Sequence, residues 1–195
     1  MRVIGLTGGI GMGKSTAANA FRRAHIPVFD ADATVHALQA PGGRALRAIG
    51  AAFPGTVVNG ALDRAALRSA VLGQPEALRR LERIIHPMVR AEERAFLARA
   101  RRTGARVAVL DIPLLLETGG QQRVDHVVVM SAPRNVQIAR VRKRRHMDQA
   151  QIEAVIARQM PDARKRRLAD TVVQTGLSRH HALRTIRRVI REALT

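Results

Sequence analysis

The 195-residue sequence contains no cysteine, no tyrosine and no tryptophan, and only four phenylalanines. The missing cysteine excludes a disulfide framework, a thiolate metal site and catalysis by a cysteine nucleophile. So few aromatic rings provide no platform on which the bases of a single-stranded nucleic acid would stack. The chain therefore depends on aliphatic residues for its core and on other groups for its chemistry.

Long apolar runs are also missing. A membrane-spanning helix needs about 18 consecutive apolar residues, and Asp111 interrupts the longest candidate, at 107–116. The first seven residues lead into a glycine-rich loop and show no signal-peptide cleavage site. We expect a cytoplasmic protein with no membrane segment.

Acidic residues are scarce relative to basic ones, 15 against 34, for a net charge of +19. Such an excess is typical of proteins that bind nucleic acids or other polyanions. Only three of the basic residues are lysines, Lys14, Lys143 and Lys165. A general preference for arginine, together with abundant alanine, is also what a biased genomic base composition produces. The charge leaves both explanations open.

Length and composition indicate one compact domain, since 46% of the residues are apolar and 25% are charged. Short apolar runs predict buried strands, and apolar residues at helical spacing predict helices. The predicted strands are residues 3–7, 27–30, 106–110, 124–130 and 171–173, and the helices that alternate with them are residues 14–24, 133–145, 147–160 and 178–194. This alternation predicts a parallel α/β sheet.

Residues 32–102 show no convincing strand. Helical spacing recurs there at residues 44–53, 63–72, 75–85 and 87–102, with a break expected at His86-Pro87. Asp63 stands where a helix N-cap is expected, and Pro75 where a first helical residue is expected. The sequence therefore predicts a helical segment within the α/β order.

One motif points directly to a ligand. Residues 8–15 match G-x-x-x-x-G-K-[ST] between a predicted strand and a predicted helix, which is the context that a phosphate-binding loop requires. Glycines let the loop turn its backbone N–H groups inward around a phosphate. Chance would produce this pattern in roughly one such chain in a thousand. The candidate nucleotide-binding residues are Gly8, Gly9, Gly11, Met12, Gly13, Lys14, Ser15 and Thr16.

Two side chains of this loop carry specific expectations. Lys14 should reach the β- and γ-phosphates, and the Ser15 hydroxyl should bind Mg²⁺. A lysine here, in a chain that uses arginine almost everywhere, suggests a geometry that a guanidinium does not meet. Asp111, at the end of a predicted strand, is either a carboxylate on the magnesium side or the cap of a turn.

The remaining sequence narrows the class of nucleotide-binding protein. It has no N-K-x-D segment, which a GTPase would use to read guanine, and the chain is short for a motor or recombination ATPase. A basic, lid-like stretch in the second half favours a small-molecule kinase. Asp32, after the second predicted strand, is a candidate general base for a substrate hydroxyl or a helix N-cap.

At this point the sequence resembles the dephospho-coenzyme A kinase family. The resemblance covers residues 4–170, in the order and spacing of the family. It is carried by Ile4–Thr16, Asp30-Ala31-Asp32 with Val35-His36, Leu62–Leu67, His86-Pro87, Pro113–Glu117, and Arg158-Gln159 with Ala169-Asp170. It implies a P-loop kinase fold, with a central parallel sheet flanked by helices, a helical acceptor-binding lobe at about residues 40–100 and a lid at about residues 134–165.

The resemblance also implies a reaction, the transfer of the γ-phosphate of ATP to the ribose 3′-hydroxyl of dephospho-coenzyme A. ATP and dephospho-coenzyme A are then the partners, with Mg²⁺, and no nucleic acid is expected. Asp32 is implied as the base and acceptor contact, while Arg140 and Arg144 would approach the phosphates. His86 and Leu115 are implied as further acceptor contacts, with a histidine that packs a loop as the alternative for His86.

Three positions depart from the family pattern. Leu116 replaces the usual phenylalanine of P-L-L-F-E, Met12 replaces a common serine, and residues 174–176 lack the usual asparagine. Another nucleotide or metabolite kinase remains an alternative, as does a basic ATP-binding protein that engages nucleic acid. The runs at 142–145 and 164–167, and the pair His180-His181, are interpreted mainly as solvated surface.

Overall fold

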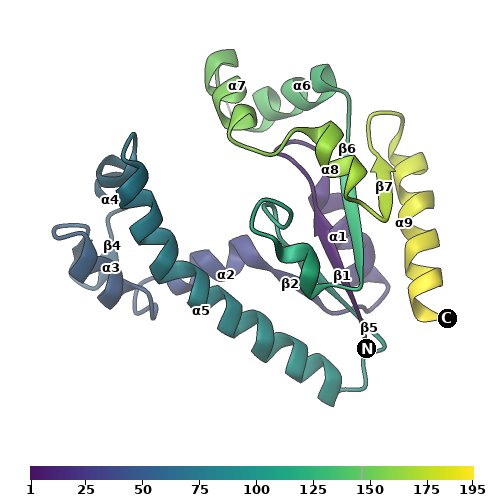
Figure 1. Ribbon diagram of the computed structural model, residues 1–195, viewed down its shortest axis with the longest axis horizontal. Helices are drawn as coiled ribbons and strands as arrows, with labels where there is room; N and C mark the ends of the chain where they lie inside the picture. The colour runs from purple at the N-terminus through teal and green to yellow at the C-terminus, as the bar shows by residue number, and fades with distance from the viewer. Residues whose placement is uncertain (146) are drawn as a thin grey trace. The chain divides into compact units, whose positions relative to one another are not determined.

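The computed structural model describes residues 1–145 and 147–195, without the side chains of residues 144 and 145 (Figure 1). The chain divides into two compact units. The first comprises residues 1–30 and 99–195, and the second comprises residues 31–98. The second unit is therefore an insertion in the sequence of the first.

The first unit is built on a five-stranded sheet whose order is β2-β5-β1-β6-β7. Every neighbouring pair in it is parallel, which confirms the α/β prediction. In register, Leu6 pairs with Asp111, and Asp30 pairs with Asp111 from the other side, so the carboxyl ends of β1, β2 and β5 lie together. The strands are β1 (Arg2–Thr7), β2 (Val28–Asp30), β5 (Val107–Asp111), β6 (His126–Ser131) and β7 (Thr171–Gln174).

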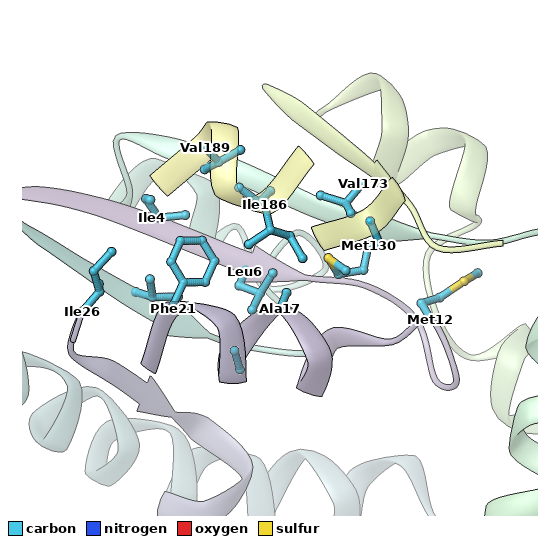
Figure 2. Packing of buried hydrophobic residues seen from close by; sticks show 14 of the residues in the cluster. Ile4, Leu6, Met12, Ala17, Phe21, Ile26, Met130, Val173, Ile186 and Val189 are labelled. Atoms are coloured by element: carbon cyan, nitrogen blue, oxygen red, sulfur yellow. The ribbon is translucent and has the colours of Figure 1, made fainter. Parts of the chain in front are cut away.

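Helices cover both faces of this sheet because its strands alternate their side chains between two apolar clusters. On one face, Ile4 and Leu6 of β1 pack with Phe21, Ile186 and Val189 (Figure 2). These last three come from α1 and α9, which lie against each other. The helices of this unit are α1 (Lys14–Arg23), α6 (Arg134–Arg145), α7 (Gln149–Ala157), α8 (Asp162–Arg167) and α9 (Arg179–Leu194), with the short 3-10 helix η1 (Gly120–Arg123).

The opposite face holds a smaller cluster in which Leu115 and Leu116 pack on Val127 and Val129 of β6. Gly5 faces this cluster, and a Cβ there would lie 2.5 Å from Leu115 Cδ2. The absence of a side chain at position 5 therefore lets the segment after β5 lie directly on β1.

The second unit has a core of its own. It contains α2 (Ala31–Leu38), α3 (Leu46–Ala52), α4 (Arg64–Val71) and most of α5 (Pro75–Arg102), with the core residues Leu38, Ala45, Ile49, Phe53, Leu67 and Ile85. Asp63 caps α4 by accepting from the backbone N–H groups of Ala65 and Ala66, both at 2.9 Å, and Pro75 begins α5. Both helix starts confirm the sequence predictions.

Two predictions for this segment are wrong. A hairpin joins β3 (Val57–Val58) to β4 (Ala61–Leu62), where no strand was expected. Its turn residues, Asn59 and Gly60, both have positive φ, 50° and 74°, the conformation that suits a two-residue hairpin turn. The expected break at Pro87 is also absent, since α5 runs through it. Among the described residues, no helix is both long and apolar enough to cross a membrane.

Candidate functional site

The loop between β1 and α1 has the backbone that its glycines predict. Gly8, Gly11 and Gly13 have φ of 153°, 75° and 87°, values that side chains rarely allow. Space is short as well, because a Cβ at Gly8 would lie 2.7 Å from the Met130 carbonyl oxygen. A Cβ at Gly11 would lie 2.7 Å from Val141 Cγ2. Conformation and packing both require glycine in this loop.

The loop ends at a helix N-terminus that is open to an anion. Gly13 is the N-cap of α1 and makes no side-chain capping bond, and the first turn contains no acidic residue. The first backbone N–H groups of a helix have no partner within the helix and carry partial positive charge. Such an end binds phosphate readily, and Ser15 is exposed in its first turn.

Lys14 extends from this turn to Asp111 at the end of β5. The distance from Lys14 Nζ to Asp111 Oδ1 is 2.6 Å, and the aspartate side chain is only 6% exposed. Strand pairing supports the arrangement, since Leu6 of β1 lies opposite Asp111. The Thr7 hydroxyl also donates to the Pro113 carbonyl at 2.9 Å. The ammonium group is therefore fixed beside the loop by a buried carboxylate.

Met12 contributes its backbone and not its side chain. The side chain is 3% exposed and belongs to the α1/α9 core, where its sulfur accepts from the Ala132 N–H at 3.1 Å (Figure 2). A serine hydroxyl at this position is therefore not needed to shape the loop, because the thioether anchors the loop to the end of β6.

Arg140 of α6 also lies beside the loop. Its guanidinium donates to the hydroxyl and the carbonyl of Thr175 at 2.9 Å and 2.6 Å. These residues line a cavity of about 180 Å³ together with Gly11, Gly13 and Thr16. The structure thus brings Arg140 and the phosphate loop to one cavity.

Of three other predicted residues, two belong to the second unit and one is buried in the first. Asp32 is exposed in the first turn of α2, in the second unit. His86 lines a groove of about 830 Å³ along α5 with four arginines and two glutamates, also in that unit: Arg79, Arg83, Arg90, Arg94, Glu76 and Glu82. Leu115 is fully buried, so its side chain offers no surface for a direct substrate contact. The side chain of Arg144 lies outside the described residues.

The donors for a magnesium ion are few. No cluster of three or more histidine, aspartate or glutamate side chains suited to a metal occurs in the described residues, which include His180 and His181. Ser15 and Asp111 still fit the way Mg²⁺ binds in phosphate-transfer sites, where one or two protein oxygens act with phosphate oxygens and water.

Comparison with known proteins gives this geometry its context. The family model described as dephospho-CoA kinase matches residues 2–179. The chain belongs to the dephospho-CoA kinase family. It is 59% identical to a dephospho-CoA kinase of Paramagnetospirillum magneticum over 85% of this chain and 78% of that one. It is 54% identical to a dephospho-CoA kinase of Gluconobacter oxydans over 95% and 94% of the two chains.

Solved structures show the same fold. A crystal structure of a Thermus thermophilus protein has a TM-score of 0.86 and 34% identity, covering 100% of this chain and 98% of that one. Dephospho-CoA kinase from Campylobacter jejuni has a TM-score of 0.67 at 21% identity, covering 98% and 97%. Shikimate kinase from Bacteroides thetaiotaomicron has a TM-score of 0.51 at 15% identity, covering 100% and 99%. The fold is thus that of the P-loop kinases.

In this dephospho-CoA kinase family member, Lys165 differs from the sequence prediction. The run 164–167 was interpreted as solvated surface, but the Lys165 side chain is 1% exposed, and its Nζ lies 2.7 Å from Glu117 Oε1. The same carboxylate accepts from the Met160 N–H at 3.0 Å. A signal was present, since Lys165 is one of three lysines in an arginine-rich chain, and Glu117 ends the family's P-L-L-x-E motif.

Two glutamines were also missed as neighbours of the phosphate loop. Gln137 of α6 and Gln159, two residues after α7, both hydrogen-bond to the backbone of Ile10. Gln159 stands in the Arg158-Gln159 pair that helped to carry the family resemblance, but nothing in the sequence assigned it a contact. No feature of the sequence around Gln137 predicts its contact with the loop.

Proposed function

We propose that this chain transfers the γ-phosphate of ATP to the ribose 3′-hydroxyl of dephospho-coenzyme A, which yields coenzyme A and ADP. One observation carries the proposal beyond family membership: the uncapped α1 N-terminus, with Lys14 held at 2.6 Å from Asp111. This is the arrangement that a phosphoryl-transfer enzyme needs, because its catalysis consists mostly of positioning and charge neutralisation.

ATP would bind with its phosphates in the loop formed by residues 8–13. The loop amides and the N-terminus of α1 supply donors, and Lys14 supplies a positive charge that follows the β- and γ-phosphates. Arg140 contributes a second charge from its cavity wall, where Thr175 fixes its guanidinium. We propose that residues 134–165 form the lid, with Arg144 as a further phosphate contact.

Ser15 and Asp111 would hold Mg²⁺, the serine directly and the carboxylate from the strand end. When bound, the ion neutralises charge on the β- and γ-phosphate oxygens. Asp111 also fixes Lys14, so this one buried carboxylate would organise both cations of the site.

The helical segment at about residues 40–100 is proposed to receive the acceptor. Its groove along α5 is lined by four arginines, His86 and the carboxylates of Glu76 and Glu82, and Arg79 is paired with Glu76 at 2.7 Å. The positive charge that remains in excess suits the diphosphate of dephospho-coenzyme A. Leu115 would act through packing, since its buried side chain lies against Gly5 of β1, the strand that leads into the phosphate loop.

Asp32 is proposed as the general base. Its carboxylate would accept the proton of the 3′-hydroxyl while that oxygen bonds to the γ-phosphorus and the bond from the γ-phosphorus to the bridging oxygen breaks, releasing ADP. Its exposure in the first turn of α2 supports this role, because an exposed carboxylate is accessible to a substrate.

The test is acceptor-dependent ADP release, measured in a coupled assay. We expect release with dephospho-coenzyme A and none with nucleoside monophosphates. Activity on a monophosphate alone would identify a different small kinase. Steeply salt-dependent binding of DNA or RNA without small-molecule phosphorylation would support the nucleic-acid alternative.

A further inference from the structure

We propose that Gln137 and Gln159 are positioning residues that hold the apex of the phosphate loop by gripping the backbone of one residue, Ile10. Neither glutamine belongs to the loop motif. Both belong to the segment 134–165. One side-chain amide accepts a hydrogen bond from Ile10, and the other donates one to it.

The contacts are specific in direction. The Ile10 N–H donates to Gln159 Oε1 at 3.0 Å, and Gln137 Nε2 donates to the Ile10 carbonyl at 2.8 Å. A backbone N–H requires an acceptor and a carbonyl requires a donor, so the two amides act with opposite polarity. Gln137 is 4% exposed, and a buried amide of this kind is costly to leave without its partner.

Gly9 makes room for this grip. A Cβ at Gly9 would lie 3.1 Å from Gln159 Oε1 and 3.2 Å from Gln137 Nε2, closer than side-chain contacts normally come. The missing side chain at Gly9 thus leaves space for the two side-chain amides, in addition to any space it leaves for a phosphate. This is a second, independent indication that both glutamine side chains are built against the loop.

The functional consequence concerns preorganisation. A loop rich in glycine has many conformations, and binding energy is lost if the ligand must select one of them. Two bonds to Ile10 fix the loop apex before the nucleotide arrives and connect it to both ends of the segment 134–165. This inference rests on the proposed binding of ATP phosphates by the loop.

The test uses one substitution at both positions. In Gln159→Glu, the carboxylate still accepts from the Ile10 N–H. In Gln137→Glu, the donor is lost, and the carboxylate opposes the Ile10 carbonyl. Each variant adds one negative charge beside the same residue, at a buried position for Gln137 and a half-buried one for Gln159. Because burial adds its own cost to the charge, the comparison of Gln159→Glu with Gln159→Met, made at one position, isolates the acceptor. Gln159→Met, which has a similar length and no polar end, removes the acceptor without adding charge.

Binding of ADP is measured by calorimetry, and KM for ATP by steady-state kinetics. We expect Gln137→Glu to raise the Kd of ADP and KM for ATP about tenfold or more. Gln159→Met should raise the same two constants about 3- to 10-fold. Gln159→Glu should remain closer to the wild type than Gln159→Met. KM for dephospho-coenzyme A should change little in all three variants. The melting temperature should change little in the two Gln159 variants, whereas the buried carboxylate of Gln137→Glu should lower it.

Equal effects of the two glutamate variants would overturn the proposal, as would unchanged nucleotide constants. A lower melting temperature and lower kcat with unchanged KM for ATP would show a role in stability only. Failure of the proposed function is separately visible, because the wild type would then bind ADP but release none from ATP in the presence of dephospho-coenzyme A.

Discussion

Lys14 is the residue on which the site most depends. Its ammonium lies 2.6 Å from the Asp111 carboxylate, beside the loop. A guanidinium is planar and larger, and it cannot take the place of this compact charge. We predict that Lys14→Arg lowers kcat/KM by about 100-fold or more, comparable to removing one preorganised donor from a transition state.

Lys143→Arg is the matched control for this variant. The same exchange is made there at an exposed position of α6, and kinetics close to the wild type are expected. Steady-state rates at saturating dephospho-coenzyme A provide the measurement. If Lys14→Arg retains normal kcat/KM, positive charge alone is sufficient at this position.

A substitution at Asp32 distinguishes the chemical step from nucleotide binding. Asp32→Asn keeps the size of the side chain and removes its ability to accept a proton. We predict a fall in kcat of about 10²- to 10⁴-fold, the usual contribution of a general base, with ADP affinity close to that of the wild type. Single-turnover phosphorylation measures the step directly, and an unchanged turnover would remove Asp32 from the mechanism.

The Lys165–Glu117 pair affects stability. Lys165→Met would leave the Glu117 carboxylate without its cation, and we predict a loss of about 3 kcal/mol in the free energy of unfolding. Adding Glu117→Gln should recover part of that loss, because the uncompensated charge is then removed. Urea unfolding of the single and double variants measures the coupling, and strictly additive losses would contradict it.

At the scale of single elements, α4 depends on its cap. Asp63→Ala removes the acceptor for two backbone N–H groups, and we predict a loss of about 1 kcal/mol in the free energy of unfolding. Asp63→Ser retains a capping oxygen and should retain most of that stability. Thermal or urea unfolding compares the two, and equal losses would show that the capping bond contributes nothing.

The elements that the sequence predicts well are those with a local cause. Short apolar runs predicted the five strands of the sheet, and Asp63 and Pro75 predicted two helix starts. The break predicted at Pro87 is wrong because a proline removes only one backbone hydrogen bond of the helix. Ile85 and Met88, on either side of it, pack in the core of the second unit and hold the helix there. Asn59-Gly60 was a recognisable hairpin signal between strands too short to show a pattern.

The same distinction applies to the candidate site. The phosphate loop is contiguous, so its residues were all predicted from one motif. Gln137 and Gln159 reach the loop across 127 and 149 residues of sequence, and no local pattern encodes such contacts. Leu115 was assigned to the substrate from a motif, whereas its side chain packs on β1 and β6.

At the scale of the whole molecule, the net charge of +19 favours both anionic substrates. We predict that raising NaCl from about 50 mM to about 300 mM increases KM for ATP and for dephospho-coenzyme A several-fold, with a smaller effect on kcat, because salt screens long-range attraction. Constants that do not depend on salt would place the excess arginine outside substrate binding.

The shared core of β1 and α9 has a consequence for the order in which the chain is made. Leu6 and Ile186 belong to one cluster and are 180 residues apart (Figure 2). At the ribosome's rate of about 5–20 residues per second, roughly 10 to 40 s separate their synthesis. The inserted residues 31–98 can fold in that interval, because they are continuous and carry their own core. The nascent phosphate loop, though translated first, must wait for α9 before its supporting core is complete.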